Sequence, residues 1–198
     1  HHLISDQRIS WNRINAFHMD EYIGVLPDAP QSFGNFLRIR IFDKVPFKNV
    51  YYLNGHATDL EEECTRYTSL LSQFPTDIVC LGIGENGHIA FNDPDVANFN
   101  DHKLVKIVKL DHVCRQQQVN EKCFETLEQV PTEALTLTIP ALLKAKWMFC
   151  IVPFKNKSQA VYRTIHGDIS EKCPASILRR KEKSSLYLDT ESAQLLNL

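Results

Sequence analysis

The segment that most constrains the fold is residues 77 to 94, which read DIVCLGIGENGHIAFNDP. It begins with an apolar run and continues into a turn that contains Gly84 and Gly87. A short apolar run that ends in glycines is typical of a strand buried inside a parallel sheet, with a ligand-binding loop at its carboxyl end. The segment therefore predicts a parallel sheet whose two faces are covered by helices.

The rest of the chain alternates between short β-rich runs and segments with helical periodicity, which predicts an α/β fold with a mostly parallel sheet. No repeat, low-complexity tract or long linker divides residues 1–198, so we expect one domain. The expected strands are 13–17, 49–54, 77–82, 103–110, 134–139, 147–153 and 184–189. The expected helices are 32–45, 59–74, 111–127, 156–166 and 190–196.

The composition argues against several classes of protein. Lys and Arg number 22 against 24 Asp and Glu, whereas a nucleic-acid-binding protein usually carries a basic excess. No apolar stretch approaches the roughly 20 residues that a membrane span needs. The six cysteines lack zinc-type spacing and no signal peptide is evident, so we expect a cytoplasmic protein. Cys80 and Cys150 lie in strand-like runs and are expected to be small buried residues.

His88 follows the glycine turn directly, and the carboxylate residue Asp93 comes five residues later in the same segment. An imidazole oriented by a carboxylate can transfer protons near neutral pH, so we predict that this pair is catalytic. The G-x-G-x-x-G spacing also matches a dinucleotide-binding fingerprint, but Asn92-Asp93-Pro94 signals a turn where that fingerprint needs a helix. His88 has no partner at metal-ligand spacing, so no zinc is expected.

Two further clusters follow other expected strands. Asp20 and Glu21 come after the first strand, and adjacent acids at the same sheet edge as His88 are candidate general bases. Lys157 follows the strand at 147–153, close to the start of a helix, where a lysine is favourable if an anion is bound. These clusters predict an enzyme site at one edge of the sheet.

The motifs HMDEYIG and LGIGENGHIAFNDP closely resemble the glucosamine-6-phosphate deaminase/isomerase family, and ALTLTIPALL and the pattern K-x-x-A-V at 157–161 agree. The resemblance extends over nearly the whole chain. It implies a Rossmann-like, three-layer α/β domain that converts an amino-sugar 6-phosphate and water to fructose 6-phosphate and ammonia, without a cofactor or metal. The alternatives are a galactosamine-6-phosphate isomerase, a 6-phosphogluconolactonase, which shares the fold, and an inactive sugar-phosphate sensor.

The resemblance also implies a role for each matching residue. Asp20 corresponds to the base that moves a proton between C2 and C1 of the open-chain sugar. His88 corresponds to the histidine that assists ring opening, and Asp93 stands where the family usually has the glutamate that orients this histidine. Asn86 occupies a position that many members fill with aspartate. Because an amide cannot accept a proton, ring opening here would depend on His88 and Asp93.

On the binding side, Lys157 corresponds to a phosphate-binding lysine, and a phosphorylated amino sugar is the expected partner. Either Arg115 or Lys122, in the region of the family's mobile lid, is expected to supply a second cation. Many members are homo-oligomers, which makes one possible here. The remaining expected substrate-binding positions are Glu21, Gly84 and Gly87.

The sequence departs from the family in two further ways. Phe154 stands where a small residue is common, close to the expected phosphate. The family also begins with a strand and a Thr-Gly-Ser-Thr-Pro-like phosphate loop before the MDEY motif, and no such loop occurs here. We therefore expect a chain that lacks the N-terminal βαβ portion of the family.

Overall fold

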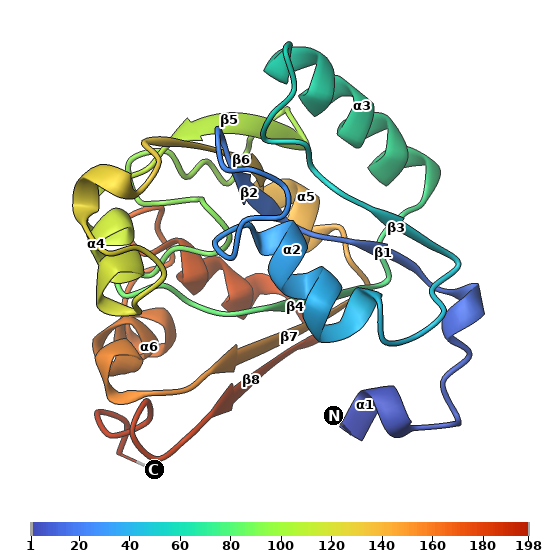
Figure 1. The fold of residues 1–198 in the computed structure, drawn as a ribbon. Helices are drawn as coiled ribbons and strands as arrows, with labels where there is room; N and C mark the ends of the chain where they lie inside the picture. Colours follow the sequence, from blue (N-terminus) through green and yellow to red (C-terminus); the bar gives the residue numbers. More distant parts are fainter. Residues whose placement is uncertain (1, 198) are drawn as a thin grey trace.

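The computed structural model describes residues 2–197, and most of their strands form parallel pairs (Figure 1). β1 (Asn15–Phe17) pairs in parallel with β3 (Asn49–Tyr51). In a separate sheet, β7 (Trp147–Val152) lies between β4 (Ile78–Leu81) and β8 (Ser184–Leu188), again in parallel. The expected mixed α/β fold with a mostly parallel sheet is therefore confirmed.

A third sheet is antiparallel and connects the segment that contains Asp20 to the segment that contains His88. β6 (Glu133–Leu137) lies between β2 (Asp20–Tyr22) and β5 (Val105–Lys109). β6 is almost entirely buried after its first residue, so its backbone is a rigid support for whatever is bonded to it. β2 was not expected as a strand, because three residues are too few to show an alternating pattern.

The longer helices begin at side chains that cap their free N–H groups. Asp59 accepts a hydrogen bond from the Glu62 N–H at 2.9 Å, and α3 (Leu60–Gln73) follows. Asp111 caps α4 (His112–Asn120) in the same way. The other α-helices are α1 (His2–Ser5), α2 (Phe33–Leu37), α5 (Ile139–Leu143) and α6 (Ser158–His166). Shorter helical turns are Trp11–Arg13, Arg38–Phe42, Leu127–Gln129, Lys155–Lys157 and Pro174–Arg180.

Several expected boundaries were wrong. The expected helix at 190–196 forms turns, because Ser192 and Asp189 bond to each other's backbone and close a local loop. The helix expected at 111–127 ends at Asn120, after which the chain enters a left-handed conformation at Lys122 with φ 60°. α5 was not expected, although Thr138 caps it and Pro140 suits its first turn.

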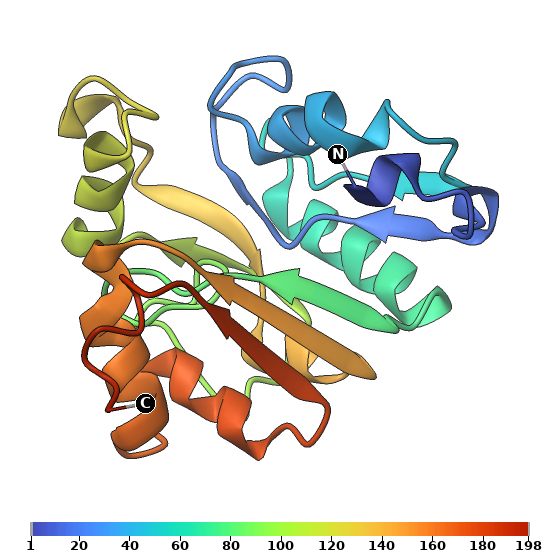
Figure 2. The ribbon, with the colours of Figure 1, turned by 90° about the horizontal axis from the view of Figure 1, so that it is seen from below.

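The sheet of β4, β7 and β8 is covered on one face only, which corrects the expectation that helices cover both. Its inner face packs against α6 and the helical turn Pro174–Arg180 in the main hydrophobic core. On the other face, paired residues are exposed together: Ile78 beside Trp147, and Ile151 beside Tyr187. Figure 2 shows the three strands side by side.

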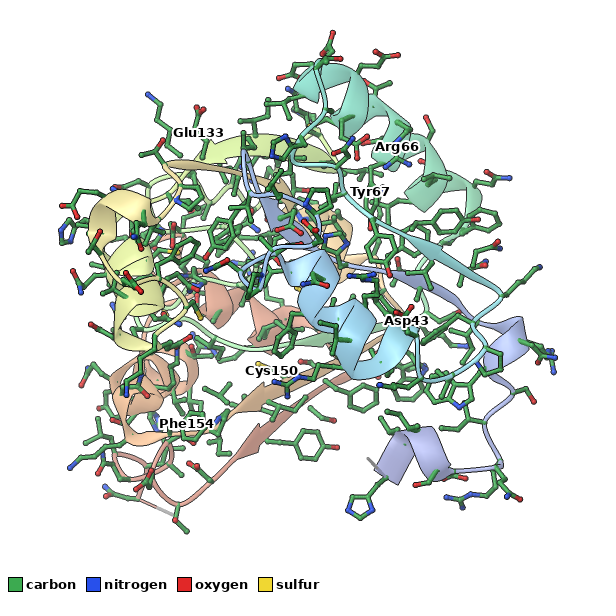
Figure 3. The ribbon with its side chains drawn as sticks, in the orientation of Figure 1. Asp43, Arg66, Tyr67, Glu133, Cys150 and Phe154 are labelled. Atoms are coloured by element: carbon green, nitrogen blue, oxygen red, sulfur yellow. The ribbon has the colours of Figure 1, made fainter. Side chains whose placement is uncertain are left out.

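Cys80 lies on this uncovered face and is exposed. Cys150, which is labelled in Figure 3, is buried on the covered face. The expectation of a buried Cys80 was therefore wrong, because successive side chains in a strand point to opposite faces. Among the described residues, no helix combines the length and the apolar character needed to cross a bilayer.

Candidate active site

The loop after β4 is a tight turn rather than the start of a helix. The Gly84 N–H donates to the His88 carbonyl at 3.0 Å, and the Gly87 N–H donates to the Gly84 carbonyl at the same distance. Gly87 has φ +94°, a conformation that favours glycine. A Cβ on Gly84 would overlap the imidazole of His88, so this glycine lets the ring lie directly against the backbone.

His88 and Asp93 come together as expected from their spacing. His88 Nδ1 lies 2.9 Å from Asp93 Oδ1, and the Asp93 carboxylate is fully buried. At this distance the carboxylate lies within hydrogen-bonding reach of the imidazole nitrogen. His88 lies beyond the carboxyl end of β4 and its side chain is 12% exposed, so a ligand at that edge of the sheet can reach the imidazole but not the buried carboxylate.

Asn86 bridges this pair and the rest of the loop. Its Nδ2 donates to Asp93 Oδ1 at 2.9 Å, and its Oδ1 accepts from the His88 N–H at 2.9 Å. Burial would raise the pKa of Asp93, but the neighbouring imidazole, the Asn86 amide and the Asp111 N–H outweigh burial and lower it. Asp93 is therefore held as a carboxylate that can orient and stabilise a charged His88.

Asp20 reaches the same region through β6. In the register of β2 and β6, Asp20 lies opposite Thr136, whose hydroxyl oxygen accepts a hydrogen bond from the Phe91 N–H at 3.1 Å. The Asn92 side chain also donates to the Leu137 carbonyl at 2.9 Å. β6 thus pairs with the strand that contains Asp20, and it also forms hydrogen bonds with the segment that follows His88.

Burial, and then the neighbouring charge of Glu21, raise the pKa of Asp20 to about 7. Such a carboxyl gains and loses a proton near neutral pH. A general base is most effective when its pKa lies near the pH at which it acts. Asp20 therefore combines the chemistry of a base with a position on β2, which pairs with the strand that bonds the segment after His88.

Glu21 lies on the opposite side of β2 and faces α2. Its Oε2 accepts from the Ser32 hydroxyl at 2.7 Å and the Gly34 N–H at 2.9 Å, and its Oε1 accepts from the Phe33 N–H at 3.2 Å. Burial would raise the pKa of Glu21, but His18 and these donors lower it. Glu21 therefore anchors β2 to the N-terminus of α2, and its oxygens are occupied there.

Tyr67, labelled on α3 in Figure 3, holds the turn that leads to Asp20. Its hydroxyl donates to the His18 carbonyl at 2.8 Å and accepts from the His18 N–H at 3.1 Å. The sequence offered no signal for this contact, because α3 and the turn are far apart along the chain. The hydroxyl fixes the backbone two residues before the candidate base.

Lys157 is buried at the amino end of α6 and lines a cavity of about 570 Å³. Its Nζ lies 3.4 Å from Oε1 of Glu121, the residue directly after α4. The cavity is also lined by Gly82 at the end of β4 and by Phe154, labelled in Figure 3 where β7 ends. A buried lysine beside a cavity, with one carboxylate contact, can bind an anion that displaces that carboxylate.

The two candidates for a second cation lie elsewhere. The Arg115 guanidinium donates to the carbonyls of Leu127 at 2.6 Å and Val130 at 2.9 Å, and so connects α4 to the segment after it. Lys122 lines a different cavity, of about 830 Å³, between the end of α4 and Gln31. In this conformation the structure brings neither cation to the cavity of Lys157.

His88, Asp93 and Cys114 could hold a metal ion, since their ligand atoms lie within 4.8 Å of one another. Cys114 comes from α4, so the sequence spacing around His88 did not indicate it. Burial, and then the charges of Asp93, Asp111 and Asp20, raise the pKa of the Cys114 thiol. The thiol is therefore held in its protonated form, which binds metals poorly.

The amino-acid sequence matches the family described as glucosamine-6-phosphate isomerases/6-phosphogluconolactonase over residues 1–187. A glucosamine-6-phosphate deaminase of Bacillus cereus (strain B4264) is 39% identical over 188 residues, which is 95% of this chain and 70% of that protein. A glucosamine-6-phosphate deaminase of Bacillus cytotoxicus is 37% identical over 192 residues, covering 97% of this chain and 71% of that protein.

Solved structures agree with the fold. A monomeric glucosamine-6-phosphate deaminase superposes with a TM-score of 0.90 at 34% identity, covering 98% of this chain and 80% of that one. The 6-phosphogluconolactonase of Thermotoga maritima superposes with a TM-score of 0.71 at 22% identity, covering 92% of this chain and 75% of that one. The second likeness concerns the fold alone.

Proposed function

Because this chain belongs to the family of glucosamine-6-phosphate isomerases and 6-phosphogluconolactonases, we propose that it acts as a glucosamine-6-phosphate deaminase. The reaction converts the amino-sugar phosphate and water to fructose 6-phosphate and ammonia. The observation that carries this choice is Asp20, a carboxyl with pKa about 7 beside the His88 loop. Among the solved structures, the identity of 34% to the deaminase against 22% to the lactonase supports the same choice.

In the proposed mechanism, the C1–O5 bond breaks as the pyranose opens. His88 gives a proton to the ring oxygen and takes up the proton of the C1 hydroxyl, which becomes the aldehyde oxygen. Asp93 lies 2.9 Å from His88 Nδ1 and stabilises the charged imidazole before and after this transfer. Neither step needs Asn86 to accept a proton, because its amide only holds Asp93 and the His88 backbone in place.

Asp20 then takes the proton from C2 of the open-chain sugar and returns it at C1. A carboxyl with a pKa about 7 is a stronger base than an ordinary aspartate and is still substantially ionised at neutral pH. The resulting compound loses ammonia from C2 after water adds there, which leaves the ketose. In this proposal Lys157, which lines the cavity of about 570 Å³, holds the phosphate at the far end of the sugar and so restricts the movement of C1 and C2.

Ammonia release from glucosamine 6-phosphate by the 198-residue chain, measured together with fructose 6-phosphate, tests this function. We expect equal amounts of the two products, and we expect solvent deuterium in the product at C1. The Asp20→Asn variant should lose proton exchange and keep substrate binding, because the amide has the same size but cannot accept the proton. Isotope entry at the wild-type rate in this variant would remove Asp20 from its role.

The alternatives give different results in the same assay. Hydrolysis of 6-phosphogluconolactone without ammonia release would indicate a lactonase, and turnover of galactosamine 6-phosphate alone would indicate the other isomerase. Saturable binding of glucosamine 6-phosphate without product would indicate a sensor. Each of these outcomes contradicts the proposed function.

We propose that one copy of the chain is the active unit. Light scattering during turnover tests this point, and the solved deaminase with TM-score 0.90 is itself described as monomeric. We also propose a reducing compartment such as the cytoplasm, since all six cysteines are free thiols.

A further inference from the structure

Asp111 lies at the start of α4 and has two oxygens with different partners. Oδ1 accepts from the Cys114 N–H at 2.6 Å and caps the helix. Oδ2 accepts from the Asn86 side chain at 2.8 Å. The cap accounts for only one of the two oxygens. The other reaches the loop that contains His88, far away along the chain.

The two hydrogens of the Asn86 amide are therefore shared between two carboxylates. One is donated to Asp93 Oδ1 at 2.9 Å and the other to Asp111 Oδ2 at 2.8 Å. Hydrogen bonds to charged acceptors are stronger than neutral ones, so rotation of this amide breaks two strong bonds at once. Asp111 thereby fixes the orientation in which Asn86 donates to Asp93.

Asp111 also contacts Asp93 directly through its backbone. Its N–H lies 3.3 Å from Asp93 Oδ2, on the oxygen that His88 does not approach. The two oxygens of Asp93 are thus held from different sides, one by Asn86 and one by the first residue before α4. The direction of the Asp93 carboxylate toward His88 depends on both contacts.

We propose that Asp111 is a positioning residue for the Asp93–His88 pair and that its carboxylate acts through the Asn86 amide. The inference deepens the proposed function, on which its catalytic consequence rests. Loss of the Asp111 carboxylate frees one hydrogen of Asn86 and lets the amide and Asp93 move together. Because ring opening needs the pair aligned, turnover falls while binding at Lys157 remains.

The variant that tests this is Asp111→Ser, since serine caps a helix well but is too short to reach Asn86. We expect kcat to fall about 10-fold, the lower end for partners that orient a reacting ligand or base, with KM changed less than about 2-fold. The matched control is Asp59→Ser on α3, which changes the same kind of cap away from the loop. It should leave kcat at the wild-type value.

A double-mutant cycle separates action through Asn86 from a general effect on α4. In an Asn86→Ala background, Asp111→Ser should change kcat by less than about 2-fold, because the intermediary is already absent. If the two losses multiply, or if Asp111→Ser leaves kcat at the wild-type value, the proposal is overturned.

A spectroscopic measurement keeps this test independent of turnover. The ring nitrogen resonances of His88, assigned with a His88→Gln variant, should shift in Asp111→Ser and stay in place in Asp59→Ser. If the wild-type chain releases no ammonia but these resonances shift, the proposed function fails while the positioning role stands. Unchanged His88 resonances in Asp111→Ser would refute the positioning role whatever the activity.

Discussion

At the scale of single residues, the raised pKa of Asp20 suits a general base but lowers the stability of the fold when the carboxyl is ionised. The ordinary pKa of an aspartate is 3.8, and burial with the charge of Glu21 raises it to about 7. Between these values the folded chain binds a proton that the unfolded chain has released, so stability falls as the pH rises. Above about pH 7 the folded state carries the full cost of a charge in this position.

Asp20→Asn should therefore stabilise the fold only at pH values where the wild-type carboxyl is ionised in the folded chain. At pH 8 we expect the free energy of unfolding to rise by about 2 to 4 kcal/mol, and near pH 4 we expect little change. Urea unfolding at the two pH values measures the difference. The exposed Asp77→Asn is the control, and an equal effect of Asp20→Asn at both pH values would contradict the argument.

Phe154 is a second residue whose conformation lowers the free energy of unfolding. Its backbone has φ 81° and ψ 146°, a region that L side chains rarely adopt, and the residue is 62% exposed. We expect Phe154→Gly to raise the free energy of unfolding by about 1 kcal/mol in urea, because glycine adopts this conformation freely. Phe154→Ala retains a Cβ and should give no such gain, and equal effects would show that the backbone is not the cause.

Sequence reasoning identified the residues whose signals are contiguous in the chain. Asn86, His88 and Asp93 were recognisable because one turn carries them all, and the structure shows them in contact. Asp111 and Glu121 were missed because their partners lie in other segments and their types are ordinary for the ends of a helix. The roles of these residues in catalysis remain predictions.

At the scale of elements, α4 connects the two ends of the candidate site. Its first turn contacts Asp93 through Asp111, and its last residue leads to Glu121, which pairs with Lys157. Glu121 is also fixed by Gln117, whose Nε2 donates to it at 2.7 Å. In this conformation the Glu121 carboxylate pairs with Lys157, the residue proposed to bind the substrate phosphate.

Glu121→Gln should make Lys157 more available to phosphate. We expect KM, and the inhibition constant of inorganic phosphate, to fall about 2- to 5-fold, since a partly exposed ion pair is a modest competitor. The value of kcat should change little. Glu125→Gln, an exposed acid in the segment after α4, is the matched control, and an unchanged inhibition constant in Glu121→Gln would mean that Glu121 does not compete.

The elements that the sequence predicted well are those with a long period or a strong cap. α3 was expected at 59–74 and lies at Leu60–Gln73, because Asp59 and the following acids mark its start. β2 and the turns at 190–196 depend on pairing and loop contacts with no periodic signal. Tertiary context decided them, so local propensity could not.

At the scale of the whole molecule, the uncovered face of β4, β7 and β8 is the largest departure from the expected architecture. Ile78, Ile151 and Tyr187 are each about half exposed on it. The main core joins residues from Leu53 to Leu178, yet none of these three side chains belongs to it. The expectation of one domain over residues 1–198 remains a prediction.

Replacing apolar residues on this face should cost little stability. We expect Ile78→Lys with Ile151→Lys to reduce the fluorescence of a bound hydrophobic dye and to change the free energy of unfolding by less than about 1 kcal/mol. Met148→Ala, on the covered face, should cost about 2 to 5 kcal/mol. Undiminished dye fluorescence in the lysine variant would place the apolar surface elsewhere.

The order of the strands has a consequence for the backbone itself. β4 pairs with β7 on one side, and within residues 2–197 no strand pairs with its other side. Alternate amides of β4 therefore point toward a partner or away from one. Deuterium uptake followed by NMR should be slow for the amides directed at β7 and faster for those directed the other way. Uniformly slow uptake along β4 would mean that its second edge is closed in solution.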